Sequence, residues 1–331
     1  MLLDKPKKSK SLYVKGKIKM NNRILLCILL LIATVLSSCG KNQSLTPPVI
    51  PDPVLEFGTD STLDIVTWNL KEFPLDNNTI THLIHIIPQI QADIIAFQEI
   101  MDASAFYAMA QQISGYQALV YNYSGGWKLA YLYKTSNITV NSEYTIFTGE
   151  SRPFPRPPYI LDLNFNGSQY FVINNHFKAL GDNVVDYNDP WDEEMRRIDA
   201  STMLEGYIQQ NHPDDRVILL GDLNDQIQEP PATNVFMAFL DKPQSYYFVT
   251  MPIAQNPTPD TVSYPRYNSI IDHILITDEL YSDFEASGSV CAALQVEEFM
   301  GGLSVYYNQI SDHRPVGIRL SGSRNRSQKD D

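Results

Sequence analysis

The chain has 331 residues, with 25 basic and 38 acidic side chains and a net charge of −13. Residues 1–38 hold eight basic groups and one acidic group, so 17 basic and 37 acidic groups remain in the rest of the chain. This balance excludes a protein that binds nucleic acid through a broad basic face. It is compatible with cation binding, and with a nuclease whose bound divalent cation reverses the local field.

The first segment has the parts of a secretory signal. Basic residues precede the apolar run Ile24–Leu36, which is short for a membrane span, and small residues close it. The ending L-S-S-C resembles the lipobox of bacterial lipoproteins, which implies cleavage before Cys39 and acylation of its sulfur. A plain signal peptide with an incidental Cys39 is the alternative. We therefore expect 1–38 to be a lipoprotein signal peptide, and the protein to be exported and lipid-anchored to the bacterial outer membrane or cell envelope.

Residues 39–61 are polar and rich in proline, which predicts an extended tether. Residues 62–321 have the pattern of one globular domain, and 322–331 read as a flexible tail. Apart from Cys39, the exported part keeps only Cys291, so its stability must come from a hydrophobic core rather than from disulfides. We expect a monomer that meets the membrane only through its lipid anchor.

Strand-length apolar runs and stretches of helical spacing alternate along the domain. Helical spacing predicts helices over Ile80–Ile90, Asp102–Ile113 and Asp192–Gln210. The apolar runs occupy residues 63–68, 92–97, 129–133, 159–165, 170–175, 217–221, 270–276 and 315–320. Because strands outnumber helices and short turns join several strand pairs, the pattern indicates packed sheets covered by helices, an α/β (α+β) fold.

Polar residues stand where the apolar runs stop. They are Asn69 in V-T-W-N, Glu99 in A-F-Q-E, His176 in I-N-N-H, Asp222 and Asn224 in G-D-L-N, Asp272 in I-D-H, and Asp312 and His313 in S-D-H-R-P. Singly, each is ordinary: an acid after a strand marks its exit to solvent, and G-D-x-N favours a turn. Rigid strand ends also hold reactive groups well, so the whole set predicts one site.

These motifs span Trp68 to Pro315 and resemble those of the endonuclease/exonuclease/phosphatase superfamily. That group includes DNase I-like nucleases, abasic-site endonucleases, neutral sphingomyelinases and inositol polyphosphate phosphatases. The resemblance implies a four-layer α/β/β/α sandwich of the DNase I-like kind. It also implies a divalent-metal-dependent phosphoester hydrolase in which the metal assists attack by water.

Oxygen ligands select Mg²⁺, Mn²⁺ or Ca²⁺ over zinc, so we expect Mg²⁺ or one of these relatives as the cofactor. Glu99 is the first candidate for a metal ligand. Asn69 is a candidate neutral ligand or phosphate contact, and Asp312 would serve the same ion or a second one.

The resemblance also implies roles for the catalytic candidates. Asp222 would orient or deprotonate the attacking water, and Asn224 would hold the scissile phosphate. Spaced two apart in an extended segment, these two side chains would share one face. His313 would contact the phosphate or act as general acid/base, with Asp272 accepting from its other ring nitrogen. His176 would donate to the phosphate or to the leaving group.

Arg156 resembles the arginine that some DNase I-like members aim at phosphate, and Arg suits a bidentate phosphate contact. A surface arginine is the alternative reading, and Arg152 competes for the role. The sequence also departs from the superfamily pattern. Residues 125–128 carry no acid where some nucleases place the Glu that backs their first catalytic histidine. Lys71 stands where abasic-site enzymes carry an Asp, which argues against a role in DNA repair.

Three functions remain open at this point. The first is an exported endonuclease or phosphodiesterase that acts on nucleic acid or another phosphodiester. The second is a phosphatase or sphingomyelinase-like phospholipase on inositol phosphates or lipids, which the acidic charge keeps in contention. The third is a non-catalytic binding lipoprotein, although such a protein has no need of these acid, amide and imidazole positions.

Overall fold

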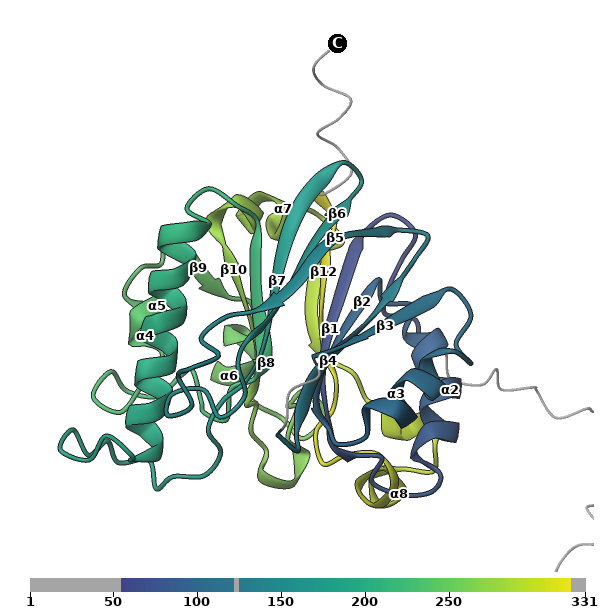
Figure 1. Ribbon diagram of the computed structural model, residues 1–331, viewed down its shortest axis with the longest axis horizontal. Coiled ribbons are helices and arrows are strands. Elements are labelled where there is room, and N and C mark those ends of the chain that lie inside the picture. The colour runs from purple at the N-terminus through teal and green to yellow at the C-terminus, as the bar shows by residue number, and fades with distance from the viewer. Residues whose placement is uncertain (1–54, 122–124, 323–331) are drawn as a thin grey trace, which may run out of the picture. The chain divides into compact units, whose positions relative to one another are not determined.

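The computed structural model describes residues 55–121 and 125–322 (Figure 1). The predicted signal segment 1–38, the lipid site Cys39, the tether up to residue 54 and the tail from residue 323 lie outside the described residues. Among the residues described, no helix combines the length and the apolar character that a membrane crossing requires.

Two six-stranded mixed sheets form the centre of the domain. The first contains, in spatial order, β11 (Val290–Ala293), β12 (Val316–Leu320), β1 (Leu63–Phe73), β2 (Ile94–Ile100), β4 (Lys128–Lys134) and β3 (Tyr116–Val120). The second contains β5 (Ile138–Thr145), β6 (Tyr159–Phe165), β7 (Ser168–His176), β8 (Val217–Asp222), β10 (Asp272–Thr277) and β9 (Tyr246–Phe248).

Helices cover the outer face of each sheet. The helices α2 (Thr79–Ile90), α3 (Ala103–Ala110) and α8 (Leu303–Gln309) share a core with the first sheet, and α4 (Glu193–Asn211) and α5 (Met237–Leu240) pack on the second (Figure 1). The remaining short elements are α6 (Met251–Gln255), α7 (Tyr281–Glu285), and the 3-10 turns η1 (Pro265–Tyr267), η2 (Asp278–Leu280) and η3 (Val296–Phe299). The layers are therefore helix, sheet, sheet and helix, and the predicted four-layer sandwich is confirmed.

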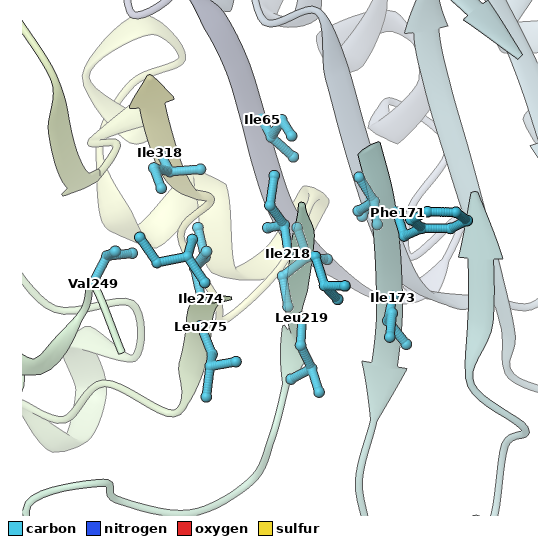
Figure 2. Packing of buried hydrophobic residues seen from close by; sticks show 14 of the residues in the cluster. Ile65, Phe171, Ile173, Ile218, Leu219, Val249, Ile274, Leu275 and Ile318 are labelled. Carbon is cyan, nitrogen blue, oxygen red and sulfur yellow. The ribbon is translucent and has the colours of Figure 1, made fainter. Parts of the chain in front are cut away.

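The alternation of side chains along each strand assigns them to two cores. Ile65 belongs to the core between the sheets, whereas its neighbour Val66 belongs to the core under α2 and α3. Figure 2 shows Ile218 of the second sheet on the side of Ile65 and Ile318, with Leu219 directed away. Every strand in the middle of the sandwich is therefore buried on both faces.

The packed domain begins earlier than the predicted start at Thr62. Phe57 is 5 % exposed, and its backbone N–H donates to the carbonyl of Ile90 at 3.2 Å. Its ring lies so close to Gly317 that a Cβ there would meet it at 2.6 Å. The predicted tether 39–61 is thus too long at its carboxyl end, because an aromatic ring near that end is part of the core.

All three predicted helices and all eight predicted strands are present, with bounds shifted by a few residues. The strands β3, β5, β9 and β11 were not predicted. Each of them lies at an edge of its sheet.

Leu219→Ala should lower the free energy of unfolding by about 2–5 kcal/mol, because the side chain is fully buried and its loss leaves a cavity. Leu180→Ala is the matched control, since Leu180 is 80 % exposed, and it should change stability by less than about 0.5 kcal/mol. Urea denaturation followed by circular dichroism measures both. Equal effects of the two substitutions would contradict the packing described here.

Candidate active site

The strand directions bring the predicted site residues to one edge of the sandwich. β1 runs parallel to β2, and β7 runs parallel to β8. β12 runs antiparallel to β1, and β10 runs antiparallel to β8. The carboxyl ends of four strands and the amino ends of two therefore meet, and in the second sheet His176 lies opposite Asp222, which lies opposite Asp272.

Asn69 joins the two sheets at this edge. Its Nδ2 donates to Asp222 Oδ2 at 2.9 Å, in the other sheet, and to Glu99 Oε1 at 3.2 Å. Its Oδ1 accepts from the backbone N–H of Lys71 at 2.8 Å, which fixes the orientation of the amide. In this arrangement Asn69 holds two carboxylates together, while its role as a metal ligand stays a prediction.

Glu99 reaches the site through an irregularity in its strand. The pairing of β2 with β4 shifts register between Phe97 and Ile100, and Glu99 has φ +63°. Such a bulge re-aims a side chain that strict alternation would send to the other face. Its Oε2 accepts from the N–H of Glu72, which also has positive φ, at 3.0 Å. Left-handed non-glycine residues of this kind concentrate at functional sites, where the surrounding structure holds them.

His313 and Asp272 form a buried pair. Nδ1 of His313 lies 2.8 Å from Oδ2 of Asp272, and Nε2 lies 4.0 Å from Oδ2 of Asp222. Burial opposes the charged imidazolium, but the carboxylates of Asp272 and Asp222 outweigh it and raise the pKa of His313 to about 10. The imidazole is therefore a cation at neutral pH, suited to hold an anionic phosphoryl group.

Asp222 is 2 % exposed, and burial raises its pKa to about 7 against the opposing charge of His313. His176 Nε2 lies 3.5 Å from Asp222 Oδ2 and 3.7 Å from Glu99 Oε1. Burial, with smaller contributions from the charges of Arg156 and His313, holds the pKa of His176 well below its usual value. The site thus contains one charged and one neutral histidine, and a carboxyl group that can exchange a proton near neutrality.

Trp127 occupies the surroundings of His176 where the sequence lacks the acid of some nucleases. The two rings stack with centroids 6.1 Å apart and planes 18° apart. Within the described part of the chain, Nδ1 of His176 is buried without a hydrogen-bond partner. Trp127 therefore lies beside this imidazole, and among the described residues no carboxylate accepts from its Nδ1.

Arg156 belongs to the same corner. It is 8 % exposed, its Nη2 donates to the carbonyl of Phe177 at 2.9 Å, and its guanidinium lies 5.5 Å from the Trp127 ring centroid. The surface reading of Arg156 is therefore wrong. Arg152 instead forms an ion pair with Asp199.

Asn224 and Asp312 lie at the margin. Asn224 donates its backbone N–H to Asp222 Oδ1 at 3.1 Å and has φ +54°. The chain therefore leaves the extended conformation after β8, and the extended segment predicted here is wrong. Asp312 Oδ2 is paired with Lys71 Nζ at 2.9 Å. Among the described residues, Asp222, Asp272 and His313 bring their ligand atoms within 4.8 Å of one another at this edge, and neither Glu99 nor Asp312 belongs to this group. The metal roles of those two stay predictions.

Groups that were not predicted from the sequence hold His313 in place. Ser311 Oγ accepts from the N–H of His313 at 3.0 Å and donates to the carbonyl of Asn69 at 2.7 Å. The hydroxyl of Tyr306 donates to the carbonyl of His313 and accepts from Trp68 Nε1 at 2.9 Å. Ser311 and Trp68 stand inside the motifs S-D-H-R-P and V-T-W-N, and their place in these motifs was the available signal.

Comparison with known proteins identifies the family of this fold. The profile of the Endonuclease/Exonuclease/phosphatase family matches residues 66–313. The chain belongs to this family. Its members are phosphoester hydrolases, and the matched range contains every strand-end residue discussed above. A search of curated proteins found no match.

Solved structures share the family fold at low sequence identity. The human nocturnin catalytic domain with bound sulfate has TM-score 0.56 and 17 % identity, covering 79 % of this chain and 94 % of that one. D. rerio TDP2, humanized by 14 mutations, gives 0.55 and 16 %, covering 78 % and 99 %. The mannosyl-6-phosphatase of Bacteroides thetaiotaomicron gives 0.54 and 14 %, covering 78 % and 99 %.

Gly221→Ala should disrupt the site, because Gly221 has φ +140° and a Cβ would lie 1.9 Å from the carbonyl oxygen of Asn175. The strands that carry His176 and Asp222 would have to separate. We expect at least a tenfold loss of activity and a destabilisation above about 1 kcal/mol. Gly206→Ala, in α4 with open space around it, should keep activity and slightly stabilise the helix. Similar behaviour of the two variants in activity and melting assays would contradict this account.

Proposed function

We propose that this protein is a divalent-metal-dependent phosphodiesterase of the endonuclease type. The observation that carries the proposal is the meeting of an Asp272–His313 pair with Asp222 and Glu99 at one buried edge, held across the two sheets by Asn69. Hydrolysis of a phosphoester needs a cationic phosphate contact, a base for water and neutralisation of charge, and this set supplies each of them.

Each residue of the site has a separate role in the proposed reaction. Asp222 accepts a proton from water, the water oxygen bonds to phosphorus, and the bond from phosphorus to the leaving oxygen breaks. His313, charged because Asp272 and Asp222 outweigh its burial, binds the phosphoryl oxygens. Neutral His176 donates a hydrogen bond to the leaving oxygen, and Arg156 and Asn224 contact the phosphate.

The donor chemistry of the site fits Mg²⁺, Mn²⁺ or Ca²⁺. Glu99 presents a carboxylate that is 14 % exposed, beside a second carboxylate at Asp222, and both are hard oxygen ligands. Glu99 would hold the ion, with Asn69 and Asp312 as further candidates. When bound, the ion supplies charge neutralisation at the phosphoryl group.

The charge balance supports a second candidate. With 17 basic and 37 acidic groups after residue 38, the net charge is better suited to a phosphatase or phospholipase that acts on a small or lipid phosphoester than to a long polyanion. The signal-like segment and Cys39 support export and lipid anchoring for either activity. Assays on DNA, RNA, sphingomyelin, phytate and p-nitrophenyl phosphate separate the two candidates.

Removal of metal with EDTA should abolish hydrolysis of bis-p-nitrophenyl phosphate, and Mg²⁺ or Mn²⁺ should restore it. Bound metal should also raise the melting temperature, because binding at roughly 100 times the Kd stabilises by about 2.7 kcal/mol. Glu99→Gln should lose both effects, whereas Glu150→Gln, at an exposed position, should keep both. Activity that survives EDTA would rule out the metal mechanism.

His313→Gln and Asp222→Asn should each lower kcat by roughly 10²-fold or more, because they remove the phosphate contact and the base. His85→Gln is the control, since His85 is exposed on α2. Circular dichroism checks that the variants fold. Rates within a few-fold of the wild type would show that the reaction takes place elsewhere.

A further inference from the structure

A buried polar contact joins the two sheets directly behind the bulge of β2. Gln98 immediately precedes Glu99 on β2. Asn174 lies two residues before His176 on β7, so these two side chains share one face of that strand. Gln98 and Asn174 are both fully buried, and Nε2 of Gln98 donates to Oδ1 of Asn174 at 2.7 Å. One amide therefore comes from the sheet that carries Glu99 and the other from the sheet that carries His176.

The side chain of Asn174 reaches the point where the pairing of β2 with β4 breaks. The register of these strands holds up to the pair of Phe97 with Ala130 and shifts between Phe97 and Ile100. Nδ2 of Asn174 donates to the carbonyl of Phe97 at 3.0 Å and to the carbonyl of Ala130 at 3.2 Å. A single amide group of the second sheet thus binds both carbonyls at the edge of the bulge in the first sheet.

Further contacts with the first sheet fix the orientation of this amide. The Gln98 group that donates to Oδ1 of Asn174 also donates to Thr67 Oγ1, on β1, at 3.0 Å. The backbone N–H of Asn174 donates to the hydroxyl of Tyr131, on β4, at 3.0 Å. Buried amides of this kind are stable only when their hydrogen bonds are made, so the whole network specifies one arrangement of β2, β4 and β7.

We propose that Asn174 is a positioning residue for Glu99, because it holds the bulge that directs this carboxylate into the site. Glu99 has φ +63°, a conformation that costs free energy and persists only where the surrounding structure holds it. The two hydrogen bonds from Asn174 supply that support from the opposite sheet. The inference rests on the proposed function, in which Glu99 binds the divalent ion, and Asn174 acts through Glu99 rather than by contact with the phosphoester.

Hydrogen exchange of the metal-free full chain tests the support of the bulge. Asn174→Leu keeps the branched side-chain skeleton and removes both donors to the carbonyls of Phe97 and Ala130. The amide hydrogens of residues 98–100 should then exchange at least about tenfold faster than in the wild type, because the local opening of the bulge loses its hydrogen bonds. The amides of β10 should keep their rate. An equal increase in β10 would show general destabilisation and contradict a positioning role.

The matched control is Asn234→Leu. Asn234 is also a buried amide whose Nδ2 donates to two carbonyls, those of Ile227 and Glu229, in the segment between β8 and α5. Its loss removes the same number of hydrogen bonds at a place without contact to the bulge. Asn234→Leu should therefore leave the exchange of residues 98–100 and the affinity for metal unchanged.

Metal affinity tests the link to Glu99. Titration with Mn²⁺, with the free ion followed by electron paramagnetic resonance, gives the Kd without turnover. Asn174→Leu should weaken Mn²⁺ binding by roughly 10- to 100-fold, the range found when a group that supports a metal ligand is lost. Gln98→Met should weaken it in the same direction and carries the test if Asn174→Leu does not fold. The double variant should lose less than the product of the two single effects, because both residues act through one contact.

The outcomes separate this inference from the proposed function. An unchanged Kd for Mn²⁺ in folded Asn174→Leu, or an equal loss in Asn234→Leu, would overturn the positioning role and leave the proposed function standing. A wild-type chain that binds no Mn²⁺ would count against the proposed metal-dependent function. Faster exchange confined to residues 98–100 in Asn174→Leu would in that case still support the role of Asn174 in holding the bulge.

Discussion

The face along which the two sheets pack is the constraint on which the domain and its site both depend. Along this face the inward side chains of the strands are apolar, except at the strand ends. At the ends, the alternation of side chains between the two faces of each strand places polar groups on this face. In β8 the sequence of inward residues is Ile218, Leu220 and Asp222, and in β10 it is Ile276, Ile274 and Asp272. The apolar residues supply the driving force for packing, and their packing holds the polar strand ends rigidly in place.

The polar end is stable only as a set. Asp222 and Asp272 are almost completely buried, and an isolated buried carboxylate is very unfavourable. His313 compensates both, and its own charge exists because they surround it. His176, which stacks with Trp127, is neutral instead. Burial is the largest effect on its pKa and lowers it. Two histidines at one edge therefore carry different charges for reasons that lie in their neighbours.

The strands and helices that could be predicted from sequence are those with a continuous apolar signal. β3 and β5 were not predicted, because an edge strand has one free side and tolerates polar residues. The residues I-T-V-N-S-E-Y-T of β5 are an example. The members of the candidate site could be predicted from the strand ends taken together, because the whole set resembles the family's motifs although each residue alone is ordinary there. The position of Glu99 could not be predicted, because strict alternation along β2 directs its side chain to the opposite face. Only the bulge in β2 directs it into the site. The contacts of Trp127 with His176 and of Tyr264 with His313 also depend on loops, whose paths are set by distant partners such as Arg314.

The bridge from Asn69 to Asp222 divides the reactive centre between the two halves of the sandwich. Neither sheet holds a complete set: Asn69 and Glu99 come from the first, and His176, Asp222 and Asp272 come from the second. The geometry of the centre therefore depends directly on how the two sheets are aligned. A slide of one sheet over the other would leave the backbone ladders intact and still pull the catalytic groups apart. Loss of turnover on warming would then precede loss of secondary structure, and the interface between the sheets would set the working temperature of the enzyme.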